Sequence, residues 1–283
     1  MPERRLPLDA GKTMSNISDL FVFAIPLIPK HRAKNWQRVL DNLQATLQSI
    51  LNQTDQNFMV LLAAGDEIDL PETNHMRVAV LNLQGDAQTN HNAEIYGASI
   101  SDMNMKRGFM ENEAKRIGAR FLMHADADDL LSNRLVEFVR STNHPNGYAL
   151  TRGFVMNYAS GKILPCPSEA IPVASFDDYC GTSIIYNMGD KPSDWENVIG
   201  IQGHHKARFL AKNAGNPLLE IDQRMAIYVL NAGENISMYS KTKSRSPDFA
   251  YYVLEGIEKH GSPMTKSQQL EFGLFFDNSL WLR

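Results

Sequence analysis

Short, continuous apolar runs recur in the first half of this chain and limit its fold more than any other feature. They cover residues 20–27, 58–64, 76–83 and 121–125. Their length and their aromatic and β-branched content predict strands that are buried on both faces. Strands of this kind occur in parallel sheets whose two faces are covered by helices.

Helical periodicity occupies much of the sequence between these runs. Apolar residues recur at helical spacing over residues 36–51. Further helices are predicted over residues 106–118, ending at Gly118, and over residues 133–141. A polar loop is expected over residues 84–103. This alternation of strands and helices predicts an α/β fold with a mostly parallel sheet flanked by helices.

The second half of the chain has a different pattern. A hairpin is predicted from residues 148–158 and 161–164, and single strands from residues 181–186 and 225–230. A helix over residues 203–214 is followed by Gly215, a typical C-terminal stop signal. Two short helices are expected at the end of the chain, over residues 249–259 and 266–276.

Composition excludes several classes of function. The 283 residues carry a net charge of −4 and no dense basic stripe, so we expect no nucleic-acid partner. Cys166 and Cys180 are too few for a disulfide framework and are expected to be reduced thiols. The sequence has no signal-peptide pattern, and no apolar run approaches the ~18 residues of a membrane span. We therefore expect a cytoplasmic protein.

Three closely spaced carboxylates directly follow the apolar run at residues 121–125. Asp126, Asp128 and Asp129 lie within four positions, where their charges repel one another. In an extended strand, residues 126 and 128 would point to the same face and could together bind Mg²⁺ or Mn²⁺. The alternative is that they cap a helix beginning near Ser132, which would account for one of the three. We favour the metal, because crowded like charges usually mark a functional site.

Two other predicted strands end in residues of interest. Pro26 lies near the end of the first apolar run, and Asp66 follows the second. In parallel sheets, ligands bind beyond the carboxyl ends of the strands. We therefore expect Pro26, Asp66 and the three aspartates to line one crevice.

Together these passages resemble the GT-A glycosyltransferases, and family 2 in particular, over roughly residues 18–235. The first strand ends in IPLIP, and TLQSILNQTDQNFMVLLAAGDE is similar to the family's passage from a helix into its second strand. KRGFMENEAKRIGARFLMHADADDLL is similar to the passage from a basic residue to the family's Asp-x-Asp signature. CGTSIIY and GHHKARFLAKNAGNP look like the acceptor-side strand and the helix after it.

The resemblance implies a role for individual residues on the donor side. Asp128 would bind Mn²⁺ or Mg²⁺, and Asp126 would contact the ribose or the metal. Asp66 would contact the uracil base, and Lys106 or Arg107 would reach the base or the diphosphate. Pro26 and Ala127 would line the nucleotide-sugar site. Asp129 either binds metal or caps the next helix, and the residues do not decide between these roles.

One position departs from the family pattern. Most inverting members begin the acceptor-side helix with an acid that serves as general base, whereas this chain has His204 and His205 there. A histidine can act as a base near neutral pH, or His205 can be a third metal ligand beside Asp126 and Asp128. Both can also be ordinary surface residues. Alternative candidates for the catalytic acid on the acceptor side are Asp178, Asp177 and Glu196.

We expect one domain similar to the GT-A proteins, followed by a C-terminal extension that resembles nothing specific. Residues 17–160 would form the nucleotide-sugar-binding half, 161–245 the acceptor-side half and 246–283 a helical extension. Aromatic residues of the extension cover the core, form a dimer contact or touch a membrane surface.

The expected reaction is transfer of a sugar from a nucleotide-sugar, with a UDP-sugar favoured, to a glycan, a lipid-linked acceptor or another hydroxyl group. Two alternatives stay open, a nucleotidyltransferase and an inactive nucleotide-sugar-binding protein of the same fold. A nucleotidyltransferase would carry a glycine-rich basic loop after its first strand, and PLIPKHRAKNW has no glycine.

Overall fold

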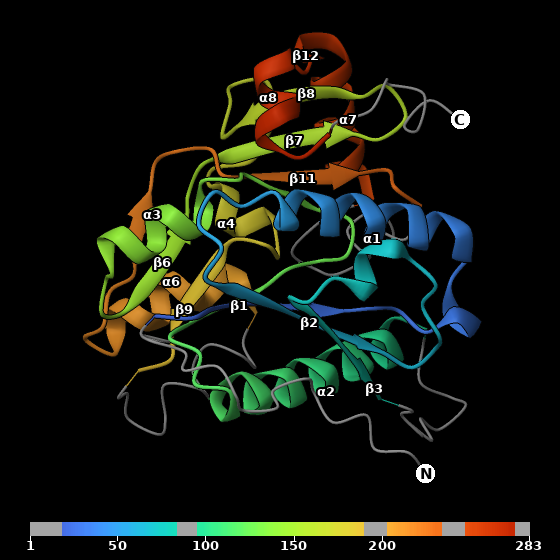
Figure 1. Ribbon diagram of the computed structural model, residues 1–283. Coiled ribbons are helices and arrows are strands. Elements are labelled where there is room, and N and C mark those ends of the chain that lie inside the picture. Colours follow the sequence, from blue (N-terminus) through green and yellow to red (C-terminus); the bar gives the residue numbers. More distant parts are fainter. Residues whose placement is uncertain (1–18, 84–94, 190–202, 234–246, 275–283) are drawn as a thin grey trace.

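The computed structural model describes residues 19–83, 95–189, 203–233 and 247–274. Their strands form two sheets (Figure 1). The larger sheet contains β1 (Phe21–Pro26), β2 (Phe58–Ala64), β3 (Val78–Asn82), β4 (Phe121–His124), β6 (Gly147–Leu150), β9 (Ile184–Asn187) and β10 (Leu219–Ile221). The smaller sheet contains β5 (Leu130–Leu131), β7 (Gly153–Asn157), β8 (Lys162–Cys166), β11 (Ala226–Leu230) and β12 (Ser262–Pro263).

The larger sheet has the order β10-β6-β9-β4-β1-β2-β3. β1 lies parallel to both β2 and β4, and β2 lies parallel to β3. Only β9 runs the other way within this sheet, antiparallel to β4 and β6. The prediction of a Rossmann-like α/β fold with a mostly parallel sheet, as in GT-A proteins, is therefore confirmed.

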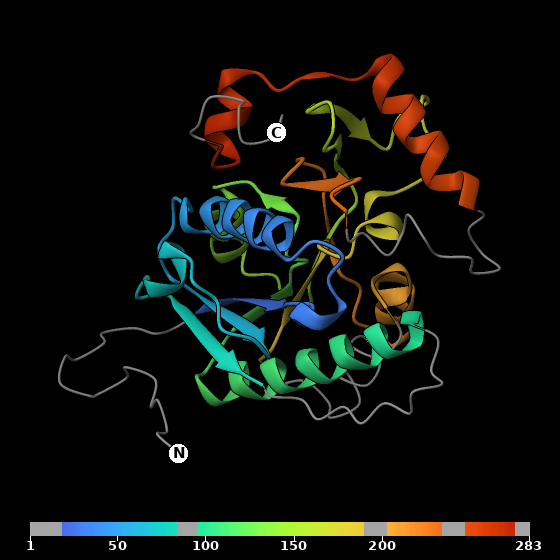
Figure 2. The same cartoon turned by 90° about the vertical axis from the view of Figure 1, so that its right-hand side faces the viewer.

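Helices cover both faces of the larger sheet. The α-helices of the described ranges are α1 (Trp36–Leu51), α2 (Ile95–Arg116), α3 (Leu135–Thr142), the short α4 (Phe176–Tyr179), α6 (His204–Asn213), α7 (Pro247–His260) and α8 (Lys266–Glu271). α2 packs on one face through Met110 and Ala114, and α6 covers the same face through Ala207 and Ala211. α1 and α3 pack on the opposite face, between the two sheets (Figures 1 and 2).

The alternation of side chains along the central strands explains these layers. Phe21, Phe23 and Ile25 of β1 enter the core beneath α1, whereas Val22 and Ala24 enter the core beneath α2. All five side chains are fully buried. A strand that is apolar at every position is therefore stable here because helices cover it on both sides.

Several predicted elements need correction. α2 begins at Ile95, so residues 95–103 are helical rather than loop, and residues 84–94 lie outside the described part of the chain. The amphipathic pattern of α2 is weak, so packing on the sheet, rather than local sequence, determines where this helix forms. Residues 148–158 form two strands, β6 and β7, which belong to different sheets. The hairpin of β7 and β8 is confirmed, as are the helix ends at Gly118 and Gly215, which both have φ of +76°.

The smaller sheet lies beyond α1 and is covered by the C-terminal helices α7 and α8 (Figure 1). Three short strands, β5, β10 and β12, have no counterpart in the predicted elements. The division of the chain at residues 160 and 245 stays a prediction.

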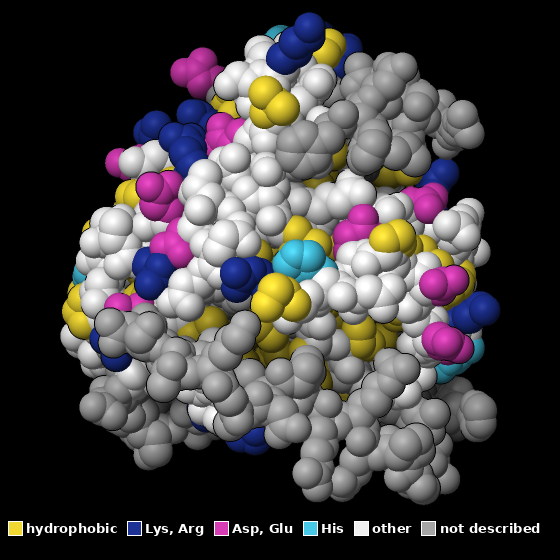
Figure 3. Space-filling view, in the orientation of Figure 1, with side chains coloured by type: hydrophobic (Ala, Val, Ile, Leu, Met, Phe, Trp, Pro, Cys, Tyr) yellow, Lys and Arg dark blue, Asp and Glu magenta, His cyan; other side chains and the backbone are white. Residues whose placement is uncertain are grey.

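Acidic and basic side chains are interspersed on the face seen in Figure 3. In the described ranges, no helix is both long and apolar enough to cross a membrane.

Candidate functional site

The carboxyl ends of three central strands meet at one edge of the larger sheet. β1, β2 and β4 are parallel neighbours, so Pro26, Asp66 and Asp126 follow one another along this edge. Asp66 Oδ2 accepts a hydrogen bond of 2.7 Å from the backbone N–H of Lys30, in the turn that follows β1. The three strand ends therefore lie side by side at one edge of the sheet, and the ligand crevice expected there stays a prediction.

The aspartates themselves lie in a turn, which we call the carboxylate turn (residues 126–129). β4 ends at His124, and the backbone N–H of Asp129 bonds to the carbonyl oxygen of Asp126 at 3.3 Å. The chain then enters β5. The interpretation that residues 126 and 128 share one face of a strand is therefore wrong, because the strand ends before either of them.

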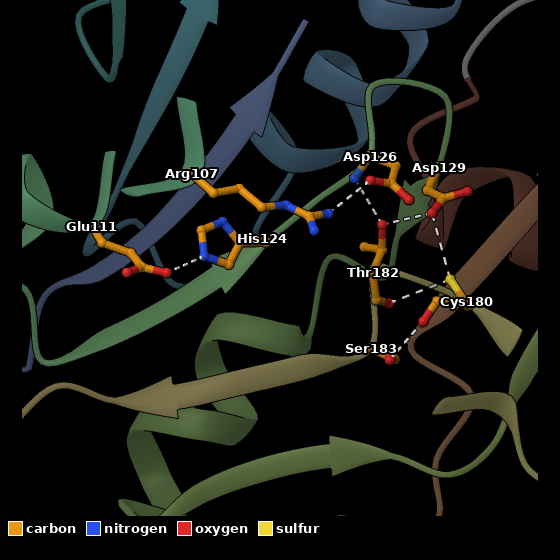
Figure 4. A network of polar contacts seen from close by, with 8 residues as sticks. All are labelled: Arg107, Glu111, His124, Asp126, Asp129, Cys180, Thr182 and Ser183. Carbon is orange, nitrogen blue, oxygen red and sulfur yellow. Dashed lines mark hydrogen bonds and ion pairs between the residues drawn. The ribbon is translucent and has the colours of Figure 1, made fainter. Parts of the chain in front are cut away.

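Arg107 of α2 reaches the first residue of the carboxylate turn. Its Nη2 lies 3.4 Å from Oδ1 of Asp126 (Figure 4). The side chain of Arg107 is 17% exposed and that of Asp126 is 33% exposed, so the pair borders solvent. Asp128 and Ala127 are also partly exposed. A guanidinium and two partly exposed carboxylates therefore stand together at the edge of the sheet.

Asp129 differs from its neighbours because it is fully buried. Its Oδ2 accepts a hydrogen bond of 2.5 Å from the hydroxyl of Thr182, and its Oδ1 accepts one of 3.2 Å from the backbone N–H of Val229. The thiol of Cys180 donates to Oδ2 over 3.5 Å. Burial raises the pKa of Asp129 well above its usual value, and the charges of Asp128 and Asp126 add to the effect.

These contacts bear on the alternative that Asp129 caps the next helix. The N-cap position of α3 is Arg134, and its side chain makes no capping hydrogen bond. The backbone N–H of Val136 in the first turn of α3 is taken by Gln53 Oε1 at 2.9 Å. Asp129 instead joins the carboxylate turn to β11 and to the segment before β9, so the capping role does not apply to it.

The two basic candidates on α2 have different surroundings. Lys106 is buried, and its Nζ donates to the carbonyl oxygen of Leu27 at 2.6 Å and pairs with Asp102 at 2.8 Å. It therefore ties α2 to the segment after β1. Arg107 is the one of the two that contacts the carboxylate turn.

His124, the last residue of β4, is buried close to Arg107 (Figure 4). Its Nε2 lies 2.9 Å from Oε1 of Glu111 on α2. Burial lowers the pKa of His124, and Arg107 adds to this, although the hydrogen bond that His124 makes to Glu111 opposes it. Nδ1 is also buried, with no hydrogen-bond partner within the described ranges.

Asp177, one of the acids predicted for the acceptor side, belongs to a second ionic cluster, which we call the α4–α6 cluster (Ser175, Asp177, Arg208 and Glu220). Asp177 is buried, and its Oδ2 pairs with Nε of Arg208 at 2.9 Å. Arg208 also pairs with Glu220 at 2.9 Å. Burial raises the pKa of Asp177, although Ser175 and Arg208 oppose the shift. Asp178, beside it, is partly exposed.

The two histidines begin α6, one turn before Arg208. His204 is partly buried and His205 is exposed, and their ring centroids lie 5.7 Å apart. Glu196 lies outside the described residues. Over the described ranges, no three His, Cys, Asp or Glu side chains are grouped so as to hold a metal ion, so His205 does not join Asp126 and Asp128 in such a group.

Several residues around the carboxylate turn have no role in the sequence-based prediction. Thr182 contacts both Asp126 and Asp129, and Gly181 lies against the carboxylate of Asp126. Glu111, which contacts His124, and Arg208, which contacts Asp177, likewise have no predicted role. The contacts join residues that are 13 to 56 positions apart in the chain, so local periodicity gives no signal for them.

Comparison with known proteins gives distant similarities only. No family model matches the chain, and no curated protein matches it. Among solved structures, residues 1–349 of Staphylococcus aureus TarS match with a TM-score of 0.43 and 12% identity, over 74% of this chain and 60% of that one. The chain thus spans less than two thirds of that TarS chain.

Two further structures are similar to a comparable degree. The same TarS region in complex with UDP-GlcNAc has a TM-score of 0.43 and 12% identity, over 88% of this chain and 69% of that one. A putative nucleotide-diphospho-sugar transferase from Desulfovibrio desulfuricans G20 has a TM-score of 0.35 and 10% identity, over 85% and 96%. These similarities are too distant to support a conclusion about function.

Proposed function

We propose that this protein is a glycosyltransferase that takes a sugar from a nucleotide-sugar, with a UDP-sugar as the favoured donor, and transfers it to a hydroxyl group of a glycan or lipid-linked acceptor. The observation that carries the proposal is the carboxylate turn at the carboxyl end of β4, with Arg107 against Asp126. The motif that contains this turn is also the strongest part of the resemblance to GT-A glycosyltransferases.

The donor set of the turn fits a divalent cation that is shared with a ligand. Asp129 is buried and bonded to Thr182 and Val229, whereas Asp126 and Asp128 are partly exposed and are the carboxylates that would hold Mg²⁺ or Mn²⁺. Two carboxylates are too few for a metal site made by protein alone, but Mg²⁺ is often bound by one or two carboxylates together with substrate phosphates. We therefore infer that metal and nucleotide bind together.

The bound metal would stabilise the negative charge that develops on the leaving nucleoside diphosphate. Arg107 is placed to supply a second positive charge at the same edge of the sheet, and a diphosphate would compete with Asp126 for its guanidinium. Asp66 is proposed to contact the base, and Pro26 to line its pocket. Lys106 is not proposed to contact the donor, because its ammonium group is already bonded to Leu27 and Asp102.

The catalytic base is proposed to lie among His204, His205 and Asp178. These side chains begin α6 or lie in α4, and all three have some exposure to solvent. Asp177 is a weaker candidate than Asp178, because it is buried against Arg208. Removal of a general base typically lowers turnover by ~10²–10⁴-fold while nucleotide binding survives. Removal of a metal ligand would weaken nucleotide binding itself.

A binding and turnover screen tests the proposal. We expect UDP or a UDP-sugar to raise the melting temperature in the presence of Mn²⁺, because a ligand that binds the folded state stabilises it. Asp128→Asn should abolish the Mn²⁺-dependent part of this shift and leave the melting temperature of the protein alone nearly unchanged. Asp69→Asn, at an exposed position near the same edge, is the matched control.

Turnover distinguishes the proposed reaction from its alternatives. A glycosyltransferase releases UDP from a UDP-sugar when an acceptor is present. Release of pyrophosphate from a nucleoside triphosphate and a sugar phosphate would indicate a nucleotidyltransferase instead. Binding without turnover across a panel of donors and acceptors would indicate a binding protein. If no nucleotide or nucleotide-sugar shifts the melting temperature with or without Mn²⁺, the proposed function is wrong.

A further inference from the structure

The segment Cys180, Gly181 and Thr182 lies directly against the carboxylate turn (Figure 4). It connects α4, which carries Asp178, to β9. β9 in turn pairs with β4, the strand that leads into the carboxylate turn. The segment therefore stands between the acceptor-side acids and the proposed donor site.

Thr182 makes two hydrogen bonds through one hydroxyl group. Its Oγ1 accepts from the backbone N–H of Asp126 at 2.8 Å and donates to Oδ2 of Asp129 at 2.5 Å. Thr182 is itself fully buried. A single hydroxyl therefore fixes the first and the last residue of the carboxylate turn, and Asp128 lies between them.

Gly181 contributes by having no side chain. A Cβ atom at this position would lie 2.5 Å from Oδ2 of Asp126. Such a contact is far shorter than carbon and oxygen tolerate, so the carboxylate would have to move. The backbone of Gly181 is not in the left-handed region, so the requirement is one of space alone.

We propose that Gly181 and Thr182 are positioning residues of the carboxylate turn: together they hold Asp126 and Asp128 where the metal and the diphosphate of the donor bind. This inference rests on the proposed function, since it assigns the turn to a nucleotide and a metal. It adds that a segment of the acceptor-side half sets the geometry of the donor site. Loss of a group that orients metal ligands typically weakens metal binding by ~10–100-fold.

Variants at three consecutive positions separate positioning from general packing. Thr182→Val keeps the shape of the side chain and removes both hydrogen bonds, whereas Thr182→Ser keeps the hydroxyl. Gly181→Ala introduces the clash with Asp126 and leaves both hydrogen bonds of Thr182 available. The control is Ser183→Ala, because the buried Ser183 hydroxyl donates to the carbonyl oxygen of Cys180 at 2.7 Å and contacts no carboxylate.

The first measurement is the affinity for UDP in Mn²⁺ by calorimetry. We expect Thr182→Val and Gly181→Ala to weaken it ~10–100-fold, with Thr182→Ser restoring most of it and Ser183→Ala staying close to the parent protein. If both Thr182→Val and Gly181→Ala bind as tightly as the parent, the positioning role is wrong. Should Thr182→Val fail to fold, Gly181→Ala and Thr182→Ser give the same comparison.

The second measurement needs no ligand and therefore separates this inference from the proposed function. Hydrogen–deuterium exchange of peptides covering residues 125–131 should be faster in Thr182→Val than in the parent, because the amide of Asp126 loses its acceptor. Ser183→Ala should exchange like the parent. If the parent binds no nucleotide but Thr182→Val still exchanges faster in the carboxylate turn, the proposed function is wrong and the positioning role of Thr182 stands. Parental exchange in Thr182→Val overturns the positioning role.

Discussion

The carboxylate turn and the α4–α6 cluster each bury one aspartate, yet they hold it in different ways. Asp129 is held by the Thr182 hydroxyl, the Cys180 thiol and the backbone N–H of Val229, all of them neutral. Asp177 is held by the guanidinium of Arg208. Burial raises the pKa of both carboxyl groups, but only Asp177 has a cation among its direct partners.

The two regions also differ in what their charged groups contact. In the α4–α6 cluster, Arg208 pairs with both Asp177 and Glu220, so the cluster docks α6 against α4 and β10. In the carboxylate turn, the guanidinium of Arg107 lies 3.4 Å from Asp126, and the side chains of Asp126 and Asp128 are both partly exposed. Hard divalent cations such as Mg²⁺ bind carboxylate oxygens, so we propose this turn, rather than the α4–α6 cluster, as the place where a cation binds.

The largest effect on stability is expected from breaking the α4–α6 cluster. Arg208→Ala would leave the buried carboxylate of Asp177 without its cation, and we expect a loss of about 3 kcal/mol in the free energy of unfolding. Urea denaturation would measure it. Arg116→Ala, which removes an exposed pair with Glu113, is the control and should cost much less.

A double variant sharpens this test. Asp177→Asn removes the charge that Arg208→Ala leaves uncompensated, so the two substitutions together should cost less than the sum of their separate costs. Strict additivity would mean that Arg208 stabilises the protein through Glu220 or through packing. In that case Arg208 would not act as the cationic partner of Asp177, and the two buried aspartates would not differ in this respect.

A smaller loss is expected at the other buried aspartate. Asp129→Ala would leave the hydroxyl of Thr182 and the backbone N–H of Val229 without their acceptor, at a cost of about 2 kcal/mol in the free energy of unfolding. Asp129→Asn should cost less, because its amide oxygen can still accept one of these bonds. Thermal and urea unfolding of both variants would measure the difference. Equal stability of the two variants would contradict neutral hydrogen bonding as the main contribution of Asp129.

Much of the fold follows from local sequence pattern. The strands β1, β2 and β4 are apolar at successive positions because both of their faces are buried, and this gives a clear signal. The two-residue strand β5 gives no such signal, and β11, with which it pairs, lies about a hundred residues further along the chain. The start of α2 gives no signal for a related reason, because the amphipathic pattern of this helix is weak and its packing on the sheet, rather than local sequence, determines where it forms.

The sequence predicts where the candidate site lies, but it does not predict which of its neighbouring residues are buried in structural contacts and which face solvent. Strand ends placed Asp66 and Asp126 at one edge, since parallel strands end on the same side. The sequence could not separate Asp129 from Asp126, because the difference lies in Thr182, more than fifty residues away. For the same reason it could not choose between Lys106 and Arg107, which are adjacent in the chain but face different partners.

The smallest expected effect concerns pH, and it compares a histidine from each region. His124 is buried beside the carboxylate turn, whereas His205 is exposed at the start of α6. Burial lowers the pKa of His124 in the folded protein below the ~6.5 expected when it is unfolded. As the pH falls below that value, the unfolded chain takes up a proton that the folded chain resists, so the folded state loses stability until its own lower pKa is reached.

The measurement is the free energy of unfolding from pH 7.5 downwards, for the parent, His124→Gln and His205→Gln. The slope assigned to His124 is at most ~1.4 kcal/mol per pH unit, and it should disappear in His124→Gln, whose amide can still donate to Glu111. His205→Gln, with its side chain in water, is the control. Parallel plots of unfolding free energy against pH for the parent and His124→Gln would contradict this prediction. They would mean that the folded protein accommodates a protonated His124 between Glu111 and Arg107.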